Sequence, residues 1–151
     1  MDTAFIYLIL WAGVFAIIFA LLIKKGWILG NLKQSSGARG SLDRSFVQGK
    51  WQEIEVLMSQ QKPSAYKVAI LDADKLLDYV LKAKVGSDGV MKDRLVKSRK
   101  LYADYQTYRD VGSAHGYRNR VVHDERHELF PVEVKKMISY YEKALRELKA
   151  L

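Results

Sequence analysis

The chain has 151 residues, with 25 lysines and arginines against 17 acids and a net charge of +8 at pH 7. It contains no cysteine, which excludes disulfide bonds, thiolate catalysis and cysteine-ligated zinc. The positive charge favours RNA, phosphates or the anionic inner face of a membrane as neighbours.

The first predicted element is a membrane anchor. An uncharged run begins at Ala4 and ends at Ile23. A helix of this length spans about 30 Å, the thickness of a bilayer core. A cleavable signal peptide would have a basic leader, a core helix would have a polar stripe, and this run has neither. We therefore expect a single transmembrane helix, with residues 1–25 as the anchor.

The distribution of charge around this run predicts its orientation. No basic side chain precedes the run, whereas five follow it closely: Lys24, Lys25, Lys33, Arg39 and Arg44. Because positive residues stay on the cytoplasmic side, we expect the N-terminus outside the cell (inner) membrane and the C-terminal domain in the cytoplasm. Residues 26–45 form a basic juxtamembrane segment and a flexible linker, since residues 34–41 are small and polar.

Residues 46–151 predict an all-α domain. Helical spacing or helix-end signals mark five segments: 43–60, 64–84, 90–100, 105–123 and 131–148. Ser41 or Asp43 is expected to cap the first helix, and Pro131 suits the first position of the last. No segment shows the alternation of a strand. We expect an antiparallel bundle of four main helices plus one short helix, following the single transmembrane helix.

The segment 105–123 contains the residues that point to a function. At about 100° per helical residue, His115, Arg118 and Asn119 share one face, and His123 lies at its edge. Arg120 points the other way. Arginine, amide and imidazole groups on one face can bind a phosphate, and a histidine can move a proton beside it. The alternative is a polar network that ties two helices together.

The order of these features resembles the HEPN superfamily of small helical bundles. An apolar helix containing residues 69–78 is followed by a short basic helix, then by Arg118-Asn119 and His123-Asp124, and then by an amphipathic helix. The HEPN signature is an arginine, a polar residue directly after it and a histidine a few residues later. Four residues separate Arg118 from His123 here, and Asn119 takes the polar position. The resemblance covers about residues 46–150, and a membrane anchor is not part of the usual HEPN pattern.

The resemblance implies two kinds of activity. Many HEPN proteins are metal-independent ribonucleases that build a composite site across a homodimer, and others are inactive binding or regulatory modules. In the enzyme interpretation, His123 is the general acid or base for a ribose 2′-hydroxyl or its leaving oxygen. Arg118 holds the phosphate, and Asn119 orients His123 or the phosphate. His115 is a further ligand-binding residue, and no metal or other cofactor is expected.

Geometry sets a condition on this interpretation. Arg118 and His123 lie about 140° apart on an ideal helix. Both reach one phosphate only if Arg118 bends over or if the site spans two subunits. We therefore expect a homodimer.

Other groups of residues favour ordinary structural roles. His123 and His127 are spaced for a metal on a continuous helix, but no third ligand is evident. The carboxylates of Asp72, Asp74 and Asp78 suggest a cation site, but their angular spread around the helix favours a solvated face.

The basic stretch 92–100 is similarly expected to be an exposed face, with RNA contact as the alternative. Tyr102, Tyr105 and Tyr108 are expected to pack in the bundle, with stacking on bases as the alternative.

Two functions therefore stay open. The first is a membrane-tethered HEPN-like module that binds or acts on RNA or a nucleotide, with endoribonuclease activity. The second is a non-catalytic, membrane-anchored interaction or regulatory module whose polar face is structural or binds a protein partner.

Overall fold

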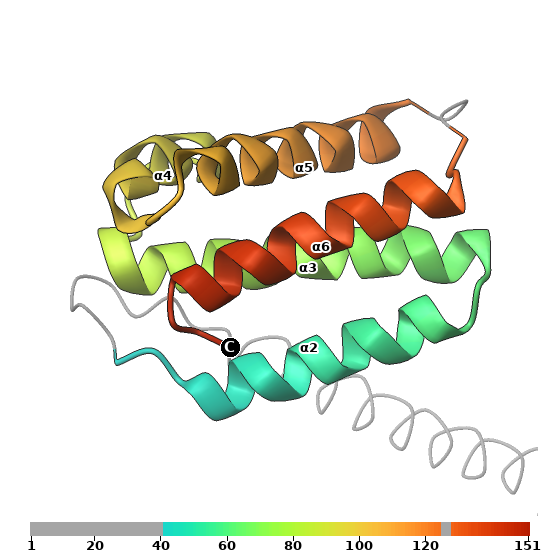
Figure 1. The fold of residues 1–151 in the computed structure, drawn as a ribbon, viewed down its shortest axis with the longest axis horizontal. Helices are drawn as coiled ribbons and strands as arrows, with labels where there is room; N and C mark the ends of the chain where they lie inside the picture. The colour runs from blue at the N-terminus through green and yellow to red at the C-terminus, as the bar shows by residue number, and fades with distance from the viewer. Residues whose placement is uncertain (1–40, 125–127) are drawn as a thin grey trace, which may run out of the picture. The chain divides into compact units, whose positions relative to one another are not determined.

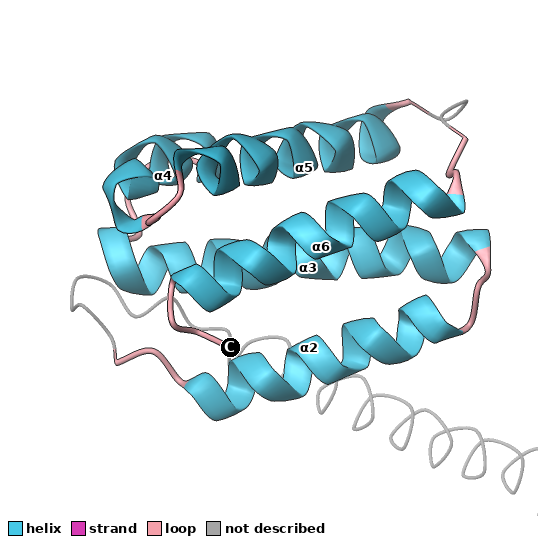
Figure 2. Cartoon of the chain, in the orientation of Figure 1, coloured by secondary structure: helices cyan, strands magenta, loops and turns pink. Residues whose placement is uncertain are grey.

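The computed structural model describes residues 41–124 and 128–151, drawn as a coloured ribbon in Figure 1. Five α-helices and one 3-10 turn make up this part: α2 (Arg44–Ser59), α3 (Pro63–Val85), α4 (Met91–Ser98), η1 (Arg99–Leu101), α5 (Tyr105–His123) and α6 (Pro131–Glu147). The described residues contain no strand (Figure 2), which confirms the predicted all-α class.

The predicted transmembrane helix, residues 4–23, lies outside the described residues. Among the helices of the described part, none is both long enough and apolar enough to cross a membrane.

Local sequence signals set the ends of the long helices. The Asp43 carboxylate accepts the backbone N–H of Phe46 at 3.0 Å and caps α2. Pro63 and Pro131 begin α3 and α6, where a missing N–H costs nothing. The residue that follows α3, Gly86, has a φ of +96°, which glycine adopts without the strain of a Cβ. The structure therefore selects Asp43 as the predicted cap of the first helix and confirms Pro131 as the first residue of the last helix.

Helix α3 is the centre of the bundle. The ribbon colours in Figure 1 show that consecutive long helices run antiparallel, while α3 and α6 run in the same direction. α3 packs against α2, α4, α5 and α6. Its apolar stripe is fully buried or nearly so: Ala69, Ala73, Leu76, Leu77 and Val80. Burying a leucine or valine side chain is worth about 1.5–3 kcal/mol, so α3 dominates the packing.

The turn between α3 and α4 is held by a buried arginine. Arg94 is only 4% exposed, and its Nε donates to Asp78 Oδ1 at 2.7 Å. Its Nη1 also donates to the carbonyl of Gly89 at 2.6 Å. The prediction of an exposed basic face is thus wrong at Arg94, because a carboxylate and backbone carbonyls together satisfy its guanidinium. The other basic residues of that stretch are exposed: Lys92, Lys97, Arg99 and Lys100.

Two glycines in the interior of α5 have no structural need to be glycine within the described domain. A Cβ built at Gly112 or Gly116 would meet no atom within 4 Å. Since glycine in a helix interior costs about 0.5–1 kcal/mol relative to alanine, Gly112→Ala and Gly116→Ala should each raise the free energy of unfolding by about that amount. Urea denaturation followed by circular dichroism measures the change.

Gly86→Ala is the matched control, because its positive φ should make the same substitution destabilising. A loss of stability at Gly112 or Gly116 would contradict the open surface described for α5.

Candidate functional site

The candidate site is built around Asp74 of α3, which is only 4% exposed. Its Oδ1 accepts the hydroxyl of Tyr141 at 2.9 Å and lies 2.8 Å from His115 Nδ1. Its Oδ2 lies 3.3 Å from Arg118 Nε. Side chains from α5 and α6 therefore converge on one carboxylate of α3.

The expectation that Asp72, Asp74 and Asp78 lie on a solvated face is wrong for two of them. Asp74 is buried by α5 and α6, and the side chain of Asp78, paired with Arg94, is only 18% exposed. Asp72 is the most open of the three, with its side chain 43% exposed and 3.3 Å from Lys75. Asp74 and the partly buried Asp78 remain favourable because neighbouring helices supply donors, which the spacing within α3 cannot reveal.

Asp74 occupies an apolar position of α3. Ile70, Leu77 and Leu81 precede and follow it at helical spacing and are completely buried. An ionised carboxylate in such a position costs several kcal/mol unless donors surround it. The interruption of this row by an acid was the signal in the sequence that could have identified Asp74.

Tyr141 is a fixed donor to this carboxylate. Burial, together with the adjacent negative charge of Asp74, raises the pKa of the Tyr141 hydroxyl well above its ordinary value. The hydroxyl therefore keeps its proton at neutral pH and donates it to Asp74. α6 is joined in this way to α3 through the core.

Asp74 also fixes the ring of His115. An ionised carboxylate only accepts hydrogen bonds, so the 2.8 Å contact assigns a proton to Nδ1 of His115. In the neutral ring Nε2 is then the acceptor, and it lies 3.4 Å from the Asn119 amide nitrogen. The side chain of His115 is 18% exposed, so this ring is oriented from inside and reachable from outside.

Arg118 is held from two sides. Its Nε faces Asp74 Oδ2 at 3.3 Å, an ion-pair distance without hydrogen-bond alignment. Its Nη1 donates to Asn119 Oδ1 at 3.0 Å, so Asn119 links Arg118 to His115. The side chain of Arg118 is 26% exposed, and its Nη2 forms no hydrogen bond with a described residue. A fixed guanidinium with a free donor can bind one more anionic oxygen.

His123 lies apart from this network. It is exposed at the end of α5 and has no hydrogen bond or ion pair with the described residues. On a helix it follows Asn119 by one turn, so His115, Asn119 and His123 form one row along α5. The structure thus brings three of the four predicted site residues together and leaves the fourth at the solvent-exposed end of their row.

Two further points concern the predicted ligands. Within residues 41–124 and 128–151, no group of three or more potential metal ligands occurs. His127 lies outside the described residues. The sequence did not single out Tyr141 for this site, since a tyrosine on the apolar face of α6 is typical of a core residue.

No protein-family model, curated protein or solved structure matches this chain.

The central role of Asp74 predicts a large difference between two neighbouring acids. Asp74→Ala removes the shared partner of Tyr141, His115 and Arg118, and should lower the free energy of unfolding by about 3–5 kcal/mol. Asp72→Ala removes only a surface ion pair and should cost less than about 1 kcal/mol. Chemical denaturation of the two variants measures both values, and similar losses would contradict the site described here.

Proposed function

We propose that this chain is a membrane-tethered HEPN-like module that acts on RNA as a metal-independent endoribonuclease. One observation supports this most: His115 and Arg118 are oriented by a buried carboxylate and are still partly open to solvent. Donors that are already oriented and partly exposed can hold a phosphate and stabilise the charge that develops on it. The tether itself is proposed from the uncharged run 4–23.

The proposed reaction assigns a role to each side chain. The 2′-oxygen of a ribose attacks the adjacent phosphorus while the bond from phosphorus to the 5′-oxygen breaks. His123 accepts the 2′-hydroxyl proton or delivers a proton to the leaving oxygen, and the second imidazole of the row, His115, is available for the other transfer. Arg118 binds a non-bridging oxygen through its free edge, and Asn119 orients the phosphate. A cyclic phosphate and a 5′-hydroxyl result, with no water consumed.

The contacts of Arg118 favour a site shared by two copies. Arg118 and His123 point about 140° apart on an ideal helix. Arg118 is also tied to Asp74 and Asn119, which opposes its bending toward His123. We therefore propose a homodimer in which Arg118 of one copy and His123 of the other act on one phosphate.

A second function is supported by a different observation. The Asp74 carboxylate is only 4% exposed and joins three helices. A network of this kind can serve architecture alone, in which case the chain is a non-catalytic, membrane-anchored interaction module. His115 and Arg118 would then act only to satisfy Asp74.

Substitution of His123 separates these two functions, because this exposed side chain has no structural role in the described domain. In the full chain, His123→Ala should change stability by less than about 0.5 kcal/mol. It should slow cleavage of a single-stranded RNA by about 10²- to 10⁴-fold. Cleavage is followed by gel electrophoresis of end-labelled RNA, and stability by thermal melting.

Arg120→Ala is the control, since Arg120 is exposed on the same helix and lies over the ring of Tyr117 instead of joining the Asp74 network. It should cleave RNA as the unmodified chain does. Full cleavage by His123→Ala, or no cleavage by the unmodified chain, would favour the non-catalytic module.

A further inference from the structure

A shallow groove runs between α4 and α5 and opens beside the candidate site. Its α4 wall includes Lys92 and Val96, and its α5 wall includes Tyr108, Arg109, Gly112 and Gly116. Both walls are largely apolar, and each carries one cation, Lys92 on α4 and Arg109 on α5. Val96 is 60% exposed, so its part of the α4 wall is open to solvent.

The two glycines leave the backbone of α5 bare along the groove. Apart from the adjacent residues and backbone of α5 itself, no atom of the described residues lies within 4 Å of the position that a Cβ would occupy at Gly112 or Gly116. Glycine at such positions destabilises a helix, and it allows another chain to approach the backbone closely. Internal packing therefore does not explain these glycines, whereas an external occupant would.

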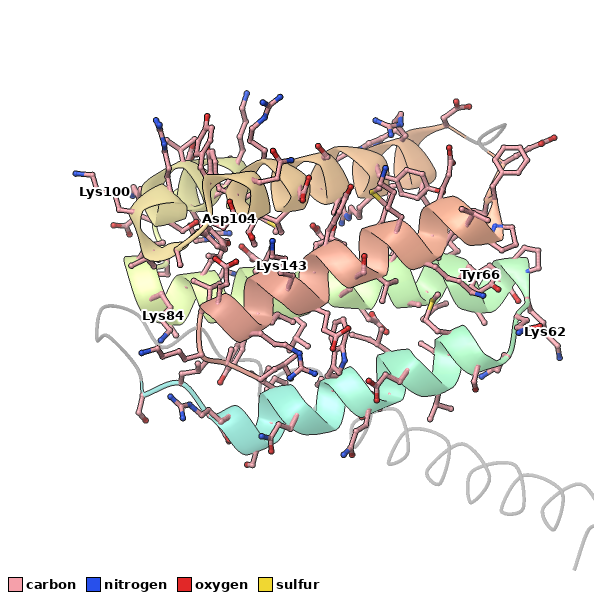
Figure 3. All side chains as sticks on the ribbon, in the orientation of Figure 1. Lys62, Tyr66, Lys84, Lys100, Asp104 and Lys143 are labelled. Carbon is pink, nitrogen blue, oxygen red and sulfur yellow. The ribbon has the colours of Figure 1, made fainter. Side chains whose placement is uncertain are left out.

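The charge around the groove indicates the chemistry of that occupant. Lys92 and Arg109 line the groove, and three further exposed cations lie on α4 and η1: Lys97, Arg99 and Lys100. None of them forms an ion pair with a described residue. Figure 3 shows Lys100 projecting away from the bundle, whereas Lys143 lies near Asp104, its partner at 2.9 Å.

Asp93, the acid of α4, forms no ion pair with these cations. Asp93 is the acidic residue in the first turn of α4, and its carboxylate accepts the backbone N–H of Val90 at 3.1 Å. The groove therefore presents unpaired positive charge, which is complementary to a phosphate backbone.

The groove is continuous with the candidate site. His115, which pairs with Asp74, also lines the groove. Asn119 and His123 follow His115 along α5 in steps of one turn. A chain lying in the groove would pass from Lys92 and Arg109 to the row of His115, Asn119 and His123.

Exposed aromatic rings favour a single strand over a duplex. Tyr105 is 55% exposed and stacks on Tyr108 with ring centroids 5.7 Å apart. Arg99 lies 4.9 Å above the ring of Tyr105. Tyrosine rings and arginine planes are surfaces on which unpaired bases stack, whereas the bases of a duplex are already stacked on each other. The expectation that these tyrosines pack in the bundle is met by the buried Tyr102 and is wrong for Tyr105.

We propose that the α4–α5 groove binds single-stranded RNA and directs it to the row of His115, Asn119 and His123. The phosphates contact Lys92 and Arg109, the sugar–phosphate chain lies against Gly112 and Gly116, and unpaired bases stack at the surface formed by Arg99 and Tyr105. This inference rests on the proposed action on RNA and adds the strandedness of the substrate and its path on the protein.

Charge reversal in the groove tests the path. Binding of a fluorescently labelled single-stranded RNA to the detergent-solubilised full chain is measured by anisotropy at several salt concentrations. Lys92→Glu with Arg109→Glu should weaken binding by about tenfold or more. The slope of log affinity against log salt should also become shallower, by about 0.7 for each phosphate that the variant no longer neutralises.

Lys67→Glu with Lys135→Glu is the matched control. Both lysines are exposed on α3 and α6, form no ion pair with a described residue, and give the same change in net charge. This variant should bind RNA much more tightly than the groove variant. Equal affinities of the two variants would overturn the proposal.

Filling the bare backbone gives an independent test. Gly112→Ala with Gly116→Ala adds two methyl groups to the groove, and the melting temperature should not fall. The affinity for single-stranded RNA should nevertheless decrease. Unchanged affinity, or equal affinity of the unmodified chain for duplex RNA, would overturn the proposed groove.

The outcomes also separate this proposal from the proposed enzyme. If the groove variant loses RNA binding while the unmodified chain shows no cleavage, the groove is retained and catalysis fails. If cleavage depends on His123 while the groove variant binds and cleaves as the control does, catalysis is retained and the groove fails. A change of oligomeric state in the groove variant, without a change in RNA affinity, would assign the groove to an interface between copies and overturn the proposal.

Discussion

A carboxylate inside an apolar helix interface must be surrounded by donors, and Asp74 imposes that requirement on this domain. Tyr141 supplies a donor from α6, His115 supplies a donor from α5, and Arg118 of α5 adds a positive charge at ion-pair distance. Because these partners come from different helices, they couple the positions of α5 and α6 to α3. The same interaction that satisfies the buried charge therefore fixes the register of the three helices.

This coupling also accounts for the properties of the surface. Asp74 orients His115 and Arg118 from inside, so that their outer edges face solvent with little freedom to reorient. A preorganised cation and a preorganised imidazole lose little entropy on binding a ligand. The groove beside them adds unpaired cations and bare backbone. The contacts that stabilise Asp74 therefore also orient the side chains of the candidate site. A ligand phosphate would bind only to the donors of His115 and Arg118 that do not contact Asp74.

The sequence predicted the features that depend on local interactions. The cap at Asp43 and the helix start at Pro131 follow from contacts within a few residues. The common face of His115 and Asn119 follows from the helical repeat. In contrast, Asp74 lies 41 residues before its partner His115. Arg94 lies 16 residues after its partner Asp78. The helical repeat gives the direction in which each side chain points, but it does not give the helix that packs against it. Asp74 and Arg94 were therefore predicted to face solvent.

The coupling between Asp74 and Arg118 is the most direct measure of whether the motif arginine is held by the buried carboxylate. A double-mutant cycle with Asp74→Asn, Arg118→Ala and the combined variant, followed by urea denaturation, gives this free energy. We predict a non-zero coupling of about 0.5–3 kcal/mol, because the two side chains share one network. Effects that add to within about 0.3 kcal/mol would show that the two residues act independently, and would contradict the central role of Asp74 in positioning the site.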